Sequence, residues 1–226
     1  MAPTKTTKTS TRPSLSREVV ADRALAIADA EGIEAVTIRR LATELGVTPM
    51  ALYWHFRTKE DLLAGLGERV LDAVELPGTT GDWTADIRAA LVALVTAMRP
   101  HPQVAHLVAD RVMAHPKGLA LTETALRTLS EAGFSDEPAS YLAMQAMRAA
   151  VTMVTGDQVD ESGRTPEERE AHLRAKQASI ASLDPQQYPA VVAHAKAMTY
   201  CSDVEMFFDL GVDLYVAGVT GLAAGR

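Results

Sequence analysis

The chain of 226 residues contains one cysteine, Cys201, and therefore cannot form a disulfide within itself. A single thiol suits a reducing compartment and excludes the disulfide-rich secreted domains. We expect Cys201 to be a small core residue, with a redox-sensing thiol as the alternative. The amino-terminal residues lack the apolar stretch of a secretory signal. No apolar run approaches the roughly 20 residues that cross a bilayer, so we expect a cytoplasmic, nucleoid-associated protein with no membrane partner.

Motifs of catalysis and of cofactor binding are also missing. The sequence has no GxSxG, GxGxxG, P-loop or HExxH motif, and its six histidines show no metal-ligand spacing with the cysteine. We therefore expect no metal, no cofactor and no enzymatic activity. A helical enzyme whose catalytic residues come from distant positions is the alternative.

Apolar positions at helical spacing, separated by Gly and Pro, predict an all-α fold. No segment alternates with the period of two that a half-buried strand requires. We expect a flexible basic arm over residues 1–15, a small helical domain over 16–62 and a larger helical domain over 63–226. The expected helices are 16–31, 37–45, 50–56, 59–74, 83–99, 103–114, 117–132, 137–157, 167–182, 185–200 and 203–223.

The segment 37–59, TIRRLATELGVTPMALYWHFRTK, predicts two short helices joined by a tight turn. Thr37 is a suitable N-cap for the first helix, and Gly46 follows its last apolar residue, where a helix end favours positive φ. Thr48 and Pro49 restart a helix as N-cap and first helical residue. Helix, short turn with glycine, helix is the layout of the helix-turn-helix motif, whose second helix enters the DNA major groove.

This segment and its flanks resemble the DNA-binding domain of the TetR family of bacterial repressors. The matching residues are Ser16-Arg17-Glu18, Ala24-Leu25, Glu31-Gly32, Val36-Thr37, Arg40-Leu41-Ala42, Leu45-Gly46-Val47, Leu52-Tyr53-Trp54-His55, Lys59 and Leu62-Leu63. Residues 130–135, SEAGFS, are similar to the tetracycline-repressor type of C-terminal domain. The resemblance implies a ligand-responsive transcriptional regulator, most simply a repressor released from a palindromic operator when a small molecule binds. An activator with the same fold, or an interaction module that has lost DNA binding, is the alternative.

The charge distribution agrees with a DNA-binding N-terminal part. The net charge of the whole chain is −7. Lys and Arg nevertheless outnumber Asp and Glu over residues 1–60, whereas acidic residues dominate residues 61–226. Because phosphate contacts supply most nonspecific affinity for DNA, the local excess matters more than the total. The excess is modest, and ordinary variation of surface charge would also produce it.

The resemblance also implies which residues meet DNA. By matching position these are Thr37, Arg39, Arg40, Thr48, Pro49, Met50, Ala51, Tyr53, Trp54, His55 and Lys59. Arg39 is the candidate for guanine readout, whereas Tyr53, His55 and Lys59 are expected on phosphates. Arg40 is either a phosphate partner or a solvated charge, and Trp54 either faces DNA or forms a half-buried scaffold. Met50 and Ala51 have no hydrogen-bonding groups and could read only thymine methyl groups, while Leu52 and Phe56 are expected in the core.

For the larger domain the resemblance implies a small-molecule effector, which the methionine-rich apolar faces predict to be largely apolar. The candidate lining residues are Met98, His106, Met113, Met144, Met147, Arg148 and Val151. Core packing is the alternative for the methionines, and a surface or ion-paired position for His106 and Arg148. The tetracycline repressor holds a magnesium–drug chelate with histidines, whereas the matching positions here are Ala109 and a position near Arg148. We therefore expect an effector other than tetracycline, bound without metal.

Two predicted helices, 137–157 and 203–223, are apolar on nearly all sides. Such helices are buried, either inside their own domain or against another chain. The resemblance implies that both pair with their two-fold mates in a homodimer. Two recognition helices about one DNA turn apart, roughly 34–36 Å, would then meet a palindrome.

Overall fold

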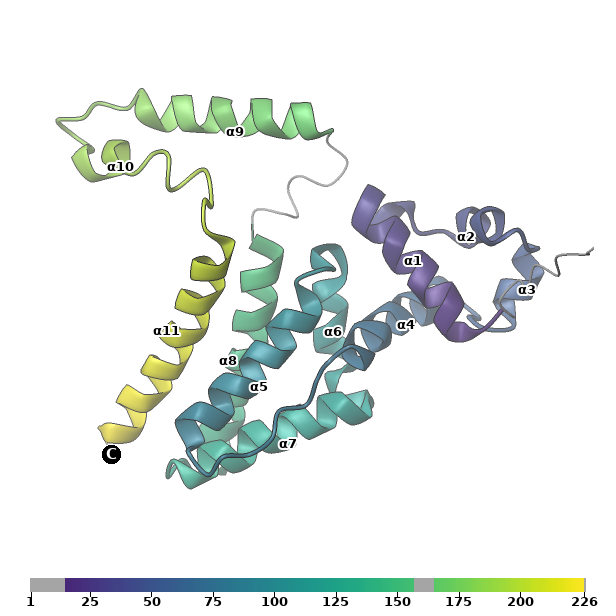
Figure 1. Ribbon diagram of the computed structural model, residues 1–226, viewed down its shortest axis with the longest axis horizontal. Helices are drawn as coiled ribbons and strands as arrows, with labels where there is room; N and C mark the ends of the chain where they lie inside the picture. Colours follow the sequence, from purple (N-terminus) through teal and green to yellow (C-terminus); the bar gives the residue numbers. More distant parts are fainter. Residues whose placement is uncertain (1–14, 157–164, 226) are drawn as a thin grey trace, which may run out of the picture.

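The computed structural model describes residues 15–156 and 165–225, and over these ranges the chain is helical with no strand (Figure 1). The helices are α1 (Arg17–Glu31), α2 (Ile38–Leu45), α3 (Pro49–Tyr53), α4 (Lys59–Asp72), α5 (Trp83–Met98), α6 (Ala105–Arg111), α7 (Pro116–Glu131), α8 (Asp136–Thr155), α9 (Pro166–Ala181), α10 (Pro189–Ala193) and α11 (Val204–Ala224). The predicted all-α fold is confirmed. The predicted basic arm, apart from Leu15, lies outside the described residues.

Helices α1, α2 and α3 form a head at one end of the molecule (Figure 1). Ser16, Thr37 and Thr48 each accept a hydrogen bond from the backbone N–H three residues later, which satisfies donors that a helix start leaves unpaired. Gly46 ends α2 in the left-handed conformation, with φ 65° and ψ 35°. The caps that the sequence predicts therefore set the length of α2 and the angle at which α3 follows.

Helix α3 is shorter than the expected helix over 50–56, because it ends at Tyr53. The backbone N–H groups of His55 and Phe56 both donate to the carbonyl oxygen of Leu52, each at 2.9 Å. This shared acceptor closes the helix in a tight turn. Leu52 and Phe56 are completely buried in the head, as predicted.

Helix α4 connects the head to the body (Figure 1). Thr58 caps it by accepting a hydrogen bond from the N–H of Asp61. Its middle packs closely against α6: a Cβ atom on Gly67 would lie 2.7 Å from the carbonyl oxygen of Leu107. The expected division after residue 62 falls within this helix, so α4 contributes to both parts of the chain.

The body consists of α5, α6, α7, α8 and α11, packed around apolar side chains of α5. Tyr215 joins α11 to α8 by donating its hydroxyl proton to the carbonyl oxygen of Leu142 at 2.8 Å, and burial raises the pKa of Tyr215 to about 12. On the other side, Arg88 of α5 pairs with Asp213 at 3.0 Å. Arg99, which caps α5, pairs with Glu205 at 2.6 Å.

Helix α11 is apolar but mostly exposed. Only Val212 and Val219 of its residues are buried. By length and composition it is the one helix in the described ranges that could cross a membrane, with a mean hydropathy of 1.4 and 11% of that window buried. Asp209 and Asp213 interrupt its apolar run, so the expectation about uninterrupted apolar runs still holds for this helix, although its mean hydropathy reaches that of a spanning helix.

Helices α9 and α10 form an arm beside the body (Figure 1). No residue of α9 is buried. The expected helix over 185–200 is reduced to α10 and a series of turns: Pro189 is the first residue of α10, and His194, with φ −101° and ψ 6°, ends it five residues later. Cys201 follows in this segment and is exposed, so the expectation of a core cysteine was wrong.

Candidate nucleic-acid interface and ligand cavity

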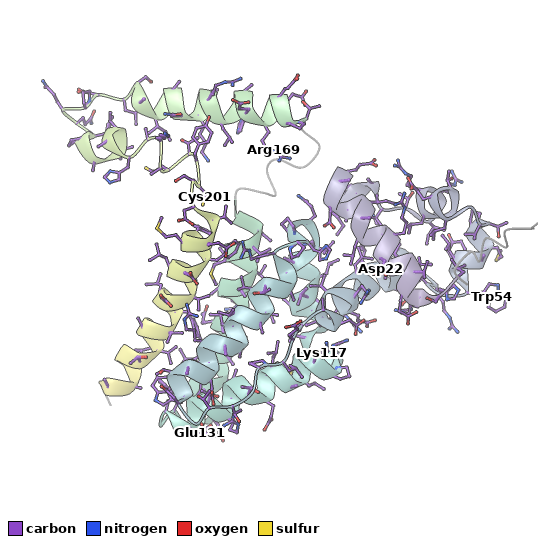
Figure 2. The ribbon with its side chains drawn as sticks, viewed as in Figure 1. Asp22, Trp54, Lys117, Glu131, Arg169 and Cys201 are labelled. Atoms are coloured by element: carbon purple, nitrogen blue, oxygen red, sulfur yellow. The ribbon has the colours of Figure 1, made fainter. Side chains whose placement is uncertain are left out.

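The tip of the head presents an exposed surface formed by α3 and the turn that follows it. Thr48 and Pro49 are exposed, as are Met50 and Tyr53, whereas Ala51 is half-buried. Trp54 is 85% exposed and projects from the head on the side away from the body (Figure 2). The half-buried alternative for Trp54 is therefore excluded. Because Met50, Tyr53 and Trp54 are all exposed on this one tip, it has the character of a binding surface.

The basic residues beside this tip differ in their partners. Arg40 pairs with Glu31 at 2.7 Å and with Glu44 at 2.9 Å, so its charge is already balanced within the head. Lys59 lies 3.5 Å from Glu34 in an exposed pair, which contributes little and can be exchanged for another anion. Arg39 is exposed at the start of α2 and has no ion pair with any described residue.

Sequence reasoning missed Arg57, which is exposed in the turn between α3 and α4. Its backbone N–H donates to Asp61 at 2.9 Å, which fixes the turn and leaves the guanidinium at the surface. A basic residue directly before the N-cap Thr58 was the available signal, because the start of a helix and an adjacent cation both favour anions.

Arg17 of α1 holds the base of this surface together. Its Nη1 donates to the carbonyl oxygen of His55 at 2.7 Å, and its guanidinium carbon lies 4.2 Å from the centre of the Phe56 ring. Its Nη2 pairs with Asp61 at 3.0 Å, and this hydrogen bond lowers the pKa of the Asp61 carboxyl. The side chain of His55 is half-buried next to this contact. One arginine thus fixes the end of α3 relative to α1 and α4.

The body contains a cavity of about 420 Å³ between α5, α6, α7 and α8. This volume lies within the range of small-molecule sites. The wall is apolar apart from Thr122, Ser140 and Arg148. Its apolar part is lined by Ile87, Ala90, Leu91, Leu94, Ala109, Val112, Met113, Leu121, Ala125, Leu126, Ala143, Met144, Ala146 and Met147.

Four of the seven predicted lining residues lie on the cavity wall, namely Met113, Met144, Met147 and Arg148. Three lie elsewhere. Met98 is completely buried in the core near the end of α5, His106 is exposed on α6, and Val151 packs against the core one turn beyond Arg148. Each of these three residues lies on a side or a turn of its helix that does not face the cavity.

Sequence reasoning missed the walls that α5 and α7 contribute, because Ala and Leu carry no chemical signal that separates a cavity wall from a core. Ala109 does line the cavity, as does Arg148. In the described part of the chain, no group of three or more His, Cys, Asp or Glu side chains is arranged to hold a metal ion.

The head and the body each match a known family. Residues 21–66 match bacterial regulatory proteins of the tetR family, and residues 76–222 match the tetracyclin repressor-like C-terminal domain. The chain belongs to the TetR family. Membership makes this TetR-family chain a ligand-responsive, DNA-binding transcriptional regulator, as the sequence predicted.

Individual TetR-family relatives are similar over nearly the whole chain. A transcriptional regulator of the helix-turn-helix type from Saccharopolyspora erythraea is 30% identical over 218 residues, covering 94% of this chain and 88% of that protein. The class C tetracycline repressor protein from Escherichia coli is 30% identical over 208 residues, covering 91% and 90%. The structure of Streptomyces coelicolor ActR in complex with actinorhodin has a TM-score of 0.72 and 27% identity, covering 92% of this chain and 98% of that one.

Proposed function

We propose that this chain represses transcription as a homodimer on a palindromic operator and releases the operator when a largely apolar molecule enters the cavity. The contact between α4 and α6 carries the proposal. Helix α6 and the turn after it supply Ala109, Val112 and Met113 to the cavity wall, while Gly67 of α4 touches the backbone of α6. Because α4 begins at Lys59 beside the recognition helix, a ligand that displaces α6 tilts the head.

On DNA, the exposed tip of α3 enters the major groove. Arg39 reads a guanine edge, and Met50 contacts thymine methyl groups, since it has no hydrogen-bonding group. Tyr53, His55 and Lys59 hold phosphates, and Lys59 exchanges Glu34 for a phosphate oxygen. The remaining contacts come from neighbouring residues on the same surface, namely Thr37, Arg40, Thr48, Pro49, Ala51, Trp54 and, in addition, Arg57.

The homodimer forms through the exposed apolar faces of α8 and α11. On α8 these include Tyr141 and Met144, and on α11 they include Leu210 and Leu214, the latter 76% exposed. A face of this kind on a monomer is unfavourable in water and marks a protein or membrane contact. The ion pairs from Arg88 to Asp209 and Asp213 hold α11 along the body. This arrangement favours a second copy of the chain, and not lipid, as the partner that covers the exposed face of α11.

The same reasoning gives the remaining properties. The protein acts in the cytoplasm on nucleoid DNA, has no enzymatic activity and needs no metal to bind its effector. Because the positions that match the histidines of the tetracycline repressor are Ala109 and a position near Arg148, tetracycline is not the effector. Calorimetric binding of the magnesium–tetracycline chelate at micromolar affinity would overturn this last statement.

DNA binding is tested by fluorescence anisotropy with a labelled duplex from the region upstream of the coding gene. Tyr53→Phe removes one phosphate donor and should weaken binding almost equally on all sequences. Tyr188→Phe, an exposed tyrosine on the arm, is the matched control and should have no effect. Lys59→Ala should reduce the salt slope of binding by about 1.

The outcomes of this experiment separate the contacts. If Tyr53→Phe or Lys59→Ala relaxes sequence preference while affinity is kept, the division into base and phosphate contacts is wrong. If the wild-type protein binds neither upstream DNA nor random duplex at low salt, the head is an interaction module and the proposed function fails.

A further inference from the structure

The cavity wall contains a single charged side chain, Arg148 of α8. The other arginines of α4 to α8, including the α5 cap, each pair with a carboxylate: Arg69 with Asp22, Arg88 with Asp213, Arg99 with Glu205, Arg111 with Glu68, and Arg127 with Glu131. Arg148 has no hydrogen bond or ion pair with any described residue. Among the described residues it is therefore a cation without a counterion, in a part of the chain where acidic residues are in excess.

Arg148 stands at the mouth of the cavity. Among the lining residues, Met113, Ser140, Met144 and Arg148 are exposed, while most of the walls from α5 and α7 are buried or half-buried. A molecule in the cavity therefore has its enclosed end among the alanines and leucines of α5 and α7. Its other end lies beside the guanidinium.

The other polar groups of the wall cannot replace Arg148 as donors. The hydroxyl of Thr122 donates to the carbonyl oxygen of Gly118 at 2.9 Å, and that of Ser140 donates to the carbonyl oxygen of Asp136 at 2.8 Å. Both hydroxyls are left as acceptors. The guanidinium is thus the donor at this site, and its planar geometry fits a carboxylate or sulfonate through two parallel hydrogen bonds.

A neutral apolar molecule at this mouth would remove water from the guanidinium without replacing its hydrogen bonds, which is unfavourable. An acidic group on the same molecule reverses the sign of that contribution. We infer that the effector is a lipophilic acid, with an apolar body in the cavity and one anionic group paired with Arg148. This inference rests on the proposed function, since it names the class of molecule for that same cavity.

The test uses two fluorescent probes that share one apolar body, N-phenyl-1-naphthylamine and 1-anilinonaphthalene-8-sulfonate, which differ by the sulfonate. The full chain should bind the sulfonate probe about tenfold more tightly than the neutral one, because charge-assisted hydrogen bonds contribute more than neutral contacts. Arg148→Met should abolish this preference by weakening the sulfonate probe, and it should not weaken the neutral probe, which no longer has to desolvate a guanidinium. Arg148→Lys should keep part of the preference, and Lys196→Met, at a residue that does not line the cavity, should keep all of it.

Ala125→Leu, which fills the cavity from α7, should weaken both probes and locates their binding. Light scattering on each variant reports the oligomeric state. Equal affinity for the two probes in the wild type, or a preference that survives Arg148→Met, overturns the inference that the effector is an acid. Either result leaves the cavity as the proposed binding site. Probe binding that Ala125→Leu does not weaken overturns the cavity itself, and with it the proposed function. Loss of the dimer in Arg148→Met with both probe affinities unchanged assigns Arg148 to the subunit contact and overturns the inference.

Discussion

Arg111 of α6 donates a hydrogen bond of 2.6 Å to Glu68 of α4. The second carboxylate oxygen of Glu68 lies 3.6 Å from Nη2 of Arg17, and Arg17 in turn donates to the carbonyl oxygen of His55. Polar contacts of charged side chains therefore run without interruption from the helix that lines the cavity to the turn that ends α3. Because Val112 follows Arg111 directly and lines the cavity, a ligand that shifts one must shift the other.

Glu68→Gln tests whether these contacts transmit the ligand signal. The variant keeps the shape of the side chain and removes its charge, so it should weaken the coupling between cavity and head by about threefold or more. Binding of N-phenyl-1-naphthylamine is measured with and without a saturating operator duplex. The factor by which the duplex changes probe affinity equals the factor by which the probe changes affinity for the duplex, because the two binding equilibria are linked. Glu131→Gln, which loses the pair with Arg127 on α7, is the control. Equal coupling in Glu68→Gln and the wild type would show that packing alone transmits the signal.

Gly67→Ala tests the close approach of α4 and α6. The added methyl group would lie 2.7 Å from the backbone oxygen of Leu107, which cannot move aside as a side chain can. We expect a loss of about 1–3 kcal/mol in the free energy of unfolding, as for other overpacked sites. A methyl group added at Gly78 meets no atom within 4 Å, so Gly78→Ala should change the free energy of unfolding by less than about 0.5 kcal/mol. Urea denaturation of both variants measures the difference, and equal stability would mean that the two helices separate freely.

Leu214→Glu tests the subunit contact of α11. A carboxylate in the middle of this exposed apolar face should convert the dimer to a monomer, because burying an unpaired charge is strongly unfavourable. Leu119→Glu introduces the same charge at an exposed leucine of α7 and should leave the dimer intact. Light scattering at several protein concentrations measures the mass. A monomeric wild-type protein, or a dimer unaffected by Leu214→Glu, contradicts the proposed interface.

Asp61→Asn tests the contact with Arg17 through its pH dependence. The pKa of Asp61 is lowered in the folded protein, chiefly by its hydrogen bond with Arg17. A carboxyl whose pKa is lowered in the folded protein stabilises the fold at pH values above its ordinary pKa of 3.8. This stabilisation is lost as the pH falls through the pKa of the folded protein. The variant should therefore be less stable than the wild type near pH 7, and the difference should shrink below about pH 4. Asp110→Asn, an exposed position without an ion pair in the described chain, should show no such trend in urea titrations.

The head follows closely from the sequence, because local chemistry determines it. Four residues favour particular positions at helix ends, and each takes the expected one: Thr37 and Thr48 as N-caps, Gly46 at a helix end and Pro49 as a first helical residue. The end of α3 was not predictable in this way, since it depends on two N–H groups that share the carbonyl of Leu52.

The cavity was harder to predict than the head, for a different reason. Ala90 or Ala125 can equally fill a core or line a space, and only the separation of the four helices distinguishes the two. Likewise, the apolar pattern of residues 203–223 predicts that the helix is covered but not by which chain. In the structure its own chain covers little of α11, and this is a property of tertiary packing that hydrophobicity does not encode.

The arm has a consequence for how the protein comes apart. Helix α9 is held by its capping box at Thr165 and by a pair from Arg174 to Glu170, with none of its residues buried. Helices of about this length are marginal in water, and α10 packs on α9 without burying any of its residues. The backbone amides of α9 should therefore exchange with deuterium long before those of α5, and a protease should cut the arm while the head and body stay folded.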